Sequence, residues 1–327
     1  MILSLRASTM ILAASACLQT GGAAGEEFPI AGRPVRIVVP FSPGGTGDFQ
    51  VRQVASKLTY ALGVSVSLDN KPGASTIHGA LEVARATPDG HTLLYTPALT
   101  FAGNPHLFSK LPYDAIRDFT PITYAIRGPS VLAVSASLPV KNVRELVEHA
   151  KRNPGKLVYG SWSAGGSGRL NAEILKGVAG IELSHLPFRA SADLAQALAS
   201  GHVQLAFDGL LTAANLAKAG KARLLAVADE SRFAAIPEVP TMAEAGVPGS
   251  YASGDYHFFG PAKLPRRIVE RWNAELTKVL RMPEISDMYA RTGMEVVASS
   301  PEEQANILRA QSDRLATIVR EFRIRLD

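Results

Sequence analysis

Two glycine-rich turns hold the residues best suited to bind a ligand. The first, Ser42-Pro43-Gly44-Gly45-Thr46-Gly47-Asp48, directly follows the apolar run Val35–Phe41. Its glycines let backbone N–H groups approach a ligand closely, and a helix starting after the turn adds the positive end of its dipole. The hydroxyls of Ser42 and Thr46 are further donors. The pattern predicts an anion site that needs no side-chain cation.

The first turn matches neither common phosphate-binding motif. No Gly-Lys-Ser/Thr follows it, and Gly45-Thr46-Gly47 lacks the third glycine of the dinucleotide fingerprint. Taken alone, the turn fits a structural role as well as a ligand-binding one. Asp48 fits best as a helix N-cap, and contact with a ligand is the second interpretation.

A similar turn occurs at residues 160–169, with the sequence Gly-Ser-Trp-Ser-Ala-Gly-Gly-Ser-Gly-Arg. It leaves a predicted strand and enters a predicted helix. Its hydroxyls and glycines give the candidate ligand-binding residues Ser161, Ser163, Gly165, Gly166 and Ser167. Two such turns, on successive lobes, predict a cleft in which both hold one anionic ligand.

The elements that position these turns alternate between short β-rich runs and helical periodicity, which predicts parallel sheets covered by helices. Strands are expected at Val35–Phe41, Val64–Leu68, His91–Tyr95, Val131–Ser135, Leu157–Gly160, Glu182–Leu186, Val203–Phe207, Arg223–Ala228 and Glu295–Ala298. Helices are expected at Asp48–Leu62, Ile77–Ala86, Val143–Arg152, Arg169–Val178, Ala192–Ser200, Leu211–Ala219, Arg266–Leu280, Glu284–Arg291 and Pro301–Phe322, the last with Ser300 as N-cap.

The length of 327 residues suits two domains better than one core. We expect an α/β protein with two lobes. Lobe 1 is predicted to contain residues 25–126 and 257–327, and lobe 2 residues 127–256, with linkers near 125–129 and 250–258.

The first 24 residues are typical of a signal peptide for export to the periplasm. Arg6 precedes an apolar stretch from Ala7 to Leu18, and Gly22 and Ala24 fit the small-residue cleavage rule. The apolar stretch is shorter than the ~20 residues that a membrane-spanning helix needs. Cys17, the single cysteine, lies in a poor lipobox, so lipid anchoring is not expected.

Composition removes several other classes of protein. With 46% hydrophobic residues the chain is not disordered, and its net charge of +5 is too dispersed to predict a nucleic-acid partner. Without a mature cysteine or a ligand-spaced histidine pair, we expect no metal and no cofactor. An exported serine hydrolase is the competing class. Its nucleophile elbow is approached only at Gly160–Ala164, which lacks the final glycine.

Four segments together resemble a known family over essentially the whole mature chain. They are Arg33–Asp48, Asn70-Lys71-Pro72-Gly73-Ala74, Pro88-Asp89-Gly90-His91-Thr92-Leu93-Leu94 and Pro237–Gly246. They are similar to the substrate-binding proteins of tripartite tricarboxylate transporters, the Bug family. The resemblance implies a two-lobed periplasmic binding protein of the type II-like, Venus flytrap kind, with a ligand cleft between the lobes.

The resemblance also implies a function. A small organic acid, mono- or dicarboxylate, would be held by one carboxylate between the two turns, partly through water, and delivered to membrane permease subunits. The protein would be a monomer and not an enzyme. A role as a ligand sensor for a signalling partner is the alternative within this class.

The second turn departs from the family pattern. Arg169 stands where relatives often have a histidine, and Ser167 is displaced by one position. Arg169 either neutralises a ligand carboxylate or faces solvent, and both interpretations stay open. Trp162, Tyr256 and His257 are candidates to line the cleft and accept an aromatic acid. Asp208 either borders the cleft, as the family position implies, or is a hydrogen-bonded structural residue.

Overall fold

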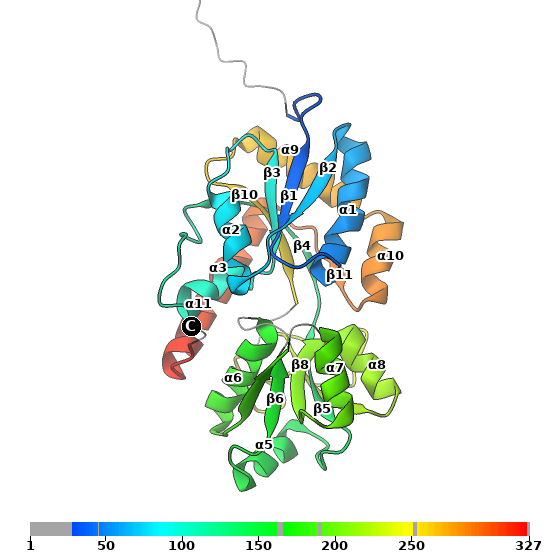
Figure 1. Ribbon diagram of the computed structural model, residues 1–327, viewed down its shortest axis with the longest axis vertical. Coiled ribbons are helices and arrows are strands. Elements are labelled where there is room, and N and C mark those ends of the chain that lie inside the picture. Colours follow the sequence, from blue (N-terminus) through cyan, green and yellow to red (C-terminus); the bar gives the residue numbers. More distant parts are fainter. Residues whose placement is uncertain (1–27, 45, 162–165, 189–190, 251–253, 326–327) are drawn as a thin grey trace, which may run out of the picture.

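The computed structural model describes residues 28–44, 46–161, 166–188, 191–250 and 254–325. It shows two lobes joined end to end, each built on one β-sheet with helices on its faces (Figure 1). The chain is therefore a two-lobed α/β protein, as expected from the sequence.

Lobe 1 has a six-stranded sheet with the strand order β11-β4-β10-β3-β1-β2. Its strands are β1 (Val35–Val39), β2 (Val66–Asn70), β3 (Thr92–Thr96), β4 (Phe119–Arg127), β10 (Tyr256–Pro261) and β11 (Glu295–Val296). Its helices are α1 (Thr46–Leu62), the 3-10 turn η1 (Ala74–Thr76), α2 (Ile77–Ala84), α3 (Leu99–Ala102), α4 (Asn104–Leu107), α9 (Arg266–Leu280), α10 (Pro283–Arg291) and α11 (Pro301–Glu321).

Lobe 2 has a five-stranded sheet with the order β7-β6-β8-β5-β9. Its strands are β5 (Ser130–Ser135), β6 (Val158–Ser161), β7 (Ser184–Pro187), β8 (Leu205–Gly209) and β9 (Ala222–Ala228). Its helices are α5 (Val143–Arg152), α6 (Ser167–Ala179), α7 (Ser191–Ser200) and α8 (Leu210–Lys218).

The prediction of parallel sheets is wrong in part, because both sheets are mixed: β1 is parallel to β2 and β3, and β6 to β7 and β8, but other pairs are antiparallel. In lobe 1, β10 runs antiparallel to β3 and β4, and in lobe 2, β5 runs antiparallel to β8 and β9. The reason lies in the chain path. Strand β4 runs toward lobe 2 and β10 returns from it, so these neighbours in the sheet point in opposite directions.

This topology brings both glycine-rich turns to the boundary between the lobes. In lobe 1, β4 ends and β10 starts at the linkers. Strand β3 is antiparallel to β10 and parallel to β1, so β1 also ends on the side of the sheet that points toward the linkers. In lobe 2, β5 starts at the linker and pairs antiparallel with β8, which is parallel to β6. The C-terminal ends of β1 and β6 therefore both point toward the boundary between the two lobes.

Alternate residues of β1 fill two different cores. Val35, Ile37 and Val39 pack on the side of α1 and α9, while Val38 packs on the side of α2 and α11. Each of these four side chains is fully buried. The strict period of two is what fixes the register of the strand, and hence the position of the turn that follows it.

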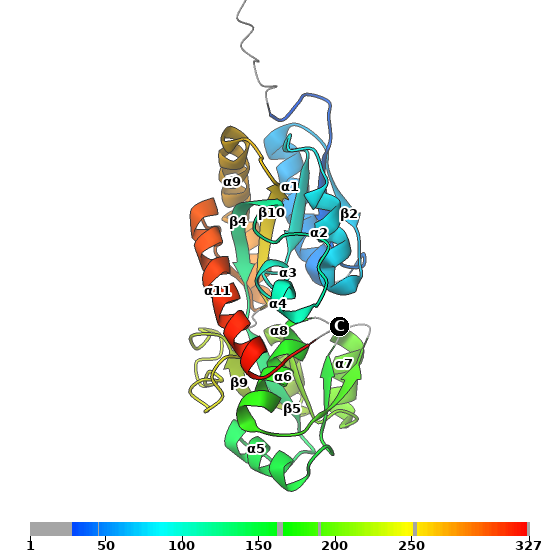
Figure 2. The same ribbon diagram turned by 90° about the vertical axis from the view of Figure 1, so that its left-hand side faces the viewer.

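The last long helix, α11, connects the lobes along one side (Figure 2). It starts at the predicted Ser300, whose hydroxyl accepts from the Glu303 N–H while the Glu303 carboxylate accepts from the Ser300 N–H. Further along, Leu315 and Val319 share one buried cluster with Leu170 and Ile174 of α6 in lobe 2. None of the helices in the described residues is long and apolar enough to cross a membrane.

Candidate functional site

The first turn is held in shape by Asp48. Gly44 adopts a left-handed φ of +77°, and its N–H donates to Asp48 Oδ2 at 3.0 Å. Ser42 is exposed, and Thr46 is the first residue of α1. Gly45 lies outside the described residues. The turn thus presents an exposed hydroxyl and the N-terminus of a 17-residue helix at the lobe boundary.

Asp48 is not the N-cap predicted from the sequence, because α1 starts two residues before it. Its carboxylate is 2% exposed and accepts from the Asn70 amide at 2.9 Å and from Arg52 Nη2 at 2.7 Å, besides Gly44. Burial alone would raise the pKa of this carboxyl, but the hydrogen bonds from Gly44, Asn70 and Arg52 outweigh burial and lower it. Asp48 is therefore a charged anchor of the turn.

Asn70 is a site residue that the sequence reasoning missed. Its Nδ2 donates both to the Phe41 carbonyl at 3.0 Å and to Asp48, so it links the end of β1 to the start of α1. The register that pairs Val39 with Asn70 brings it there. The sequence shows Asn70 as a polar residue at the end of a predicted strand. To place it beside the first turn, one must also know that this strand pairs with β1.

At Gly47 the turn packs against lobe 1 with no room for a larger residue. A Cβ on Gly47 would lie 2.7 Å from the Phe41 ring and 3.4 Å from the ring of Tyr256. Tyr256 stacks on Tyr95 with ring centroids 5.1 Å apart and is 7% exposed. Close packing against these aromatic rings therefore fixes the turn, and glycine at position 47 permits this packing.

The expectation that Tyr256 and His257 line a ligand cleft is wrong. His257 is fully buried and stacks on Tyr124 at 4.2 Å, while Tyr256 is almost fully buried. The reason is that β10 lies between β3 and β4 inside the sheet, so its side chains on both faces enter a core. Trp162 lies outside the described residues.

The second turn also joins a strand to a helix at the lobe boundary. Ser161 ends β6, Gly166 precedes α6 in an extended conformation, and Ser167 is the first residue of α6. Ser163 and Gly165 lie outside the described residues. A Cβ on Gly168 would lie only 2.6 Å from the Phe207 carbonyl oxygen. Glycine there lets the N-terminus of α6 sit directly against the end of β8.

Ser161 forms a hydrogen bond with a histidine that the sequence did not single out. Its Oγ lies 2.8 Å from Nε2 of His185, and the His185 ring stacks on Tyr159 at 4.7 Å. Burial lowers the pKa of His185, and the nearby charge of Arg169 lowers it further. The imidazole is therefore neutral at neutral pH. Only the pairing of β6 with β7, Tyr159 opposite His185, reveals this contact.

Arg169 is the third residue of α6 and is half-buried, with its Nε atom inaccessible to solvent. It lies near Tyr159 and His185, since its charge affects the pKa of both. The Tyr159 hydroxyl donates to Glu173 at 2.5 Å, and Lys176 pairs with Glu173 at 2.8 Å. The solvent-facing interpretation of Arg169 does not fit this environment, and its contact with a ligand stays a prediction.

Asp208 lies at the end of β8 and is 9% exposed. Its Oδ2 accepts from the Ser191 hydroxyl at 2.8 Å and its Oδ1 from the Gly209 N–H at 2.8 Å. Ser191 is the first described residue of α7, so the carboxylate ties two elements together at the lobe boundary. These bonds fit the structural interpretation of Asp208.

The arrangement is suited to binding rather than to acid–base chemistry. The N-termini of α1 and α6 lie at the two ends of the sheets that meet at the lobe boundary, and helix N-termini favour anions. In the described ranges, no carboxylate hydrogen-bonds His185, so Ser161 and His185 lack the third member of a hydrolytic triad. The same ranges contain no group of three or more His, Cys, Asp or Glu arranged to hold a metal ion.

Residues 50–324 match the sequence model of the tripartite tricarboxylate transporter family receptor. The chain belongs to this family. The resemblance seen in the four sequence segments is therefore confirmed, and the family is one of periplasmic solute-binding proteins.

Similar proteins cover nearly the full chain. A UPF0065 protein in the tcbD-tcbE intergenic region of Pseudomonas sp. (strain P51) is 33% identical over 91% of this chain and 88% of its own length. The solved structure of Rhodopseudomonas palustris Rpa4515 with adipate is 32% identical, with a TM-score of 0.81, over 91% of this chain and 99% of that one. MatC from Rhodopseudomonas palustris with bound malate is 27% identical, with a TM-score of 0.79, over 89% of this chain and 100% of that one.

Proposed function

We propose that this solute-binding protein captures a small organic acid between its lobes and delivers it to the membrane permease of a tripartite tricarboxylate transporter. The observation that carries the proposal is the position of the two turns. Both lie at facing sheet edges, and each is followed by a long helix whose N-terminus is directed at the boundary. A ligand carboxylate placed there is bound by backbone donors from both lobes at once.

The relatives support an organic acid as the ligand. Rpa4515 holds adipate and MatC holds malate, both dicarboxylates. One carboxylate would sit between the turns, and the half-buried Arg169 would neutralise the second one. Because such a ligand makes more contacts in the closed form, binding would favour closure of the lobes about the linkers at 125–129 and 250–258.

The cellular setting belongs to the same proposal. Residues 1–24 would direct export to the periplasm, where the mature protein, a monomer without cofactor or metal, would present its closed form to the permease. Lobe 1 would comprise residues 25–126 and 257–327, and lobe 2 residues 127–256. The serine hydrolase alternative finds little support, because Ser161 is buried and its partner His185 is bonded to no carboxylate in the residues described.

Titration calorimetry with mono-, di- and aromatic carboxylates tests the proposal. We expect at least one acid to bind with Kd below ~100 μM, about −5.5 kcal/mol. Ser161→Ala should weaken binding about tenfold, since it removes the hydrogen bond to His185 that fixes the end of β6 where the second turn starts. Ser184→Ala is the matched control, because Ser184 starts β7 at the end of the sheet that points away from the lobe boundary, and its hydroxyl donates to the Gly155 carbonyl.

Two results would count against the proposal. If no carboxylate in the panel binds, the proposal that the ligand is an organic acid is wrong. If an ester panel is hydrolysed by the wild type and Ser161→Ala abolishes turnover while Ser184→Ala does not, the hydrolase is supported instead.

A further inference from the structure

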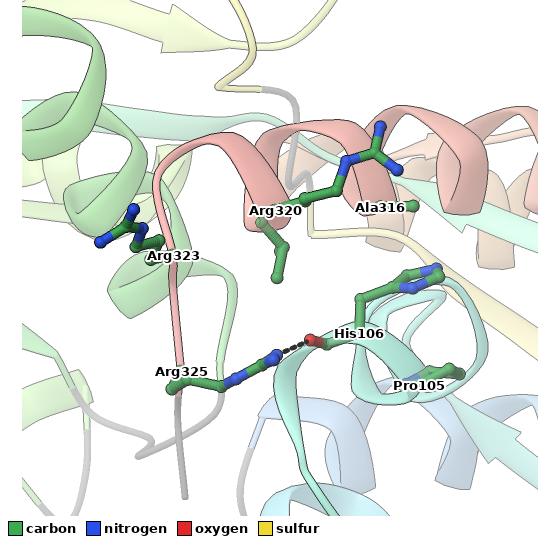
Figure 3. A pocket seen from close by; sticks show the side chains of 7 residues that line it. Pro105, His106, Ala316, Arg320, Arg323 and Arg325 are labelled. Atoms are coloured by element: carbon green, nitrogen blue, oxygen red, sulfur yellow. Dashed lines mark hydrogen bonds between the residues drawn. The ribbon is translucent and has the colours of Figure 1, made fainter.

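A positively charged cavity lies on the outside of the molecule, at the C-terminal end of α11. It has a volume of about 610 Å³ and is lined by Arg320, Arg323, Arg325 and His106 together with the apolar Pro105 and Val319. Figure 3 shows Arg320 and Arg325 on either side of His106, with Arg323 across the chain end from them. None of these residues belongs to the glycine-rich turns.

The end of α11 is a defined structure that presents these arginines. The Phe322 N–H donates to the Ile318 carbonyl, and the Ile324 N–H to the Val319 carbonyl, each at 3.0 Å. Arg323 between them has a left-handed φ of +51°, and Ile324 is buried. This is a Schellman-type helix end, in which the left-handed position is usually glycine.

The chain that leaves this helix end is fixed on the far side of the cavity. Arg325 Nη1 donates to the His106 carbonyl at 2.8 Å, as the dashed line in Figure 3 marks. The His106 ring in turn lies 2.8 Å from the Ser312 hydroxyl on α11. The walls of the cavity are therefore tied together from both sides.

The charge at the cavity is not balanced within the described residues. No carboxylate there lies within 4.0 Å of a guanidinium nitrogen of Arg320, Arg323 or Arg325. Burial lowers the pKa of His106, while Asp313 acts in the opposite direction. The positive charge of the cavity at neutral pH thus comes from the arginines. Cations near the last turn of a helix are ordinary, but three around one cavity exceed what the helix dipole requires.

We infer that this cavity binds a phosphate group. Three guanidinium groups offer more N–H donors than the two oxygens of a carboxylate can accept, whereas a phosphate has three or four charged oxygens and about two negative charges. An arginine in the left-handed conformation at a position where glycine is usual strains the backbone. Such strain is often found at residues whose side chain has a function. The apolar Pro105 and Val319 leave room for a substituent, so free phosphate and an anionic phospholipid headgroup share the required chemistry.

The variant Arg323→Gly separates this role from a structural one. Glycine relieves the left-handed strain, so the variant should unfold at the same or a higher temperature than the wild type. It should nevertheless bind phosphate at least threefold more weakly, as should Arg320→Gln. Arg144→Gln, an exposed arginine on α5 of lobe 2, is the matched control and should bind as the wild type does.

Binding is measured from the shift in melting temperature with inorganic phosphate, against sodium chloride at equal ionic strength. A second arm uses sedimentation with phosphatidylglycerol vesicles and with phosphatidylcholine vesicles. A phosphate-specific shift in melting temperature that is reduced in Arg323→Gly supports the site. Binding to phosphatidylglycerol vesicles but not to phosphatidylcholine vesicles would further show that the site accepts the phosphate of a lipid headgroup. A shift no larger than with chloride together with no vesicle binding, or a shift unchanged in Arg323→Gly and Arg320→Gln, overturns the inference.

The test is independent of the carboxylate site between the lobes. Ser161→Ala should leave the phosphate response unchanged, because Ser161 lies at the second turn and lines no part of this cavity. A failure of organic acids to bind would therefore leave the phosphate result standing, and the reverse also holds.

Discussion

Replacing Asp48 with Asn tests whether one buried carboxylate holds the first glycine-rich turn in place. The carboxylate accepts charge-assisted hydrogen bonds from the Gly44 N–H and the Asn70 amide, each worth roughly 1.5–3 kcal/mol when an ion is the acceptor. Asparagine keeps one acceptor oxygen and turns an NH2 group toward a donor, so one bond is lost and the other weakened. We expect the variant to lose roughly 3 kcal/mol of the free energy of unfolding at pH 7, measured by urea unfolding.

The matched control is Arg52→Gln, which removes only the ion pair. Arg52 is 53% exposed, so solvent screening should limit its contribution to less than about 1 kcal/mol. Calorimetry on both variants should show weaker acid binding for Asp48→Asn alone, since only that variant releases the turn. A loss of less than about 1 kcal/mol for Asp48→Asn, or one equal to that of Arg52→Gln, would refute the argument.

The same variant gives a pH signature with a defined sign. The pKa of Asp48 is lowered in the folded state, so its stabilisation is complete above the unfolded value of about 3.9 and is lost as the pH falls through the folded value. The difference in stability between wild type and Asp48→Asn should be constant from about pH 7 to 5 and shrink at lower pH. A difference that grew on acidification would contradict the assignment.

Three further predictions follow from backbone and core geometry. Gly44→Ala and Gly63→Ala should each cost about 1 kcal/mol, because φ is +77° and +68° with no atom in the way, but only Gly44→Ala should weaken acid binding in calorimetry. Gly168→Ala should destabilise by roughly 1–3 kcal/mol in urea, since its Cβ would meet the Phe207 carbonyl at 2.6 Å. His257→Phe should stabilise by roughly 1 kcal/mol, because it removes two buried nitrogens that have no hydrogen-bond partner in the described residues. Nε2 lies 3.7 Å from Asp255 Oδ2, and a loss of stability instead would show that this contact is a stabilising ion pair.

Local patterns in the sequence were sufficient for the elements that carry strong periodicity. The helix at Arg266–Leu280 has the predicted bounds, and Ser300 caps α11 as predicted. These succeed because an apolar stripe and an N-cap are encoded within a few neighbouring residues. The strand bounds shifted by one or two residues, as for Val66–Asn70 against the expected Val64–Leu68. An apolar run alone does not show where pairing with the next strand begins.

Contacts between segments that are distant in the sequence could not be predicted from local patterns. Asn70, His185 and Phe207 shape the two turns, yet each acts through a strand pairing or a helix packing that no short motif records. The strand β4 was missed because Pro121 interrupts its pattern, and β10 because its aromatic residues were read as a linker. The positions of the turns were therefore predictable from sequence, while the groups that hold them depended on the sheet topology.

The packing of α6 against α11 places a constraint on any closure of the lobes. The N-terminus of α6 carries the second turn, but Gly177 near its other end has no room for a side chain, because a Cβ there would lie 2.5 Å from the Phe322 ring of lobe 1. Arg314 of α11 also pairs with Glu230 in lobe 2. The far end of α6 is thus held by lobe 1, while the end that carries the second turn is held by the sheet of lobe 2. A closing motion must pivot close to this contact, since large displacements there would break a packed core.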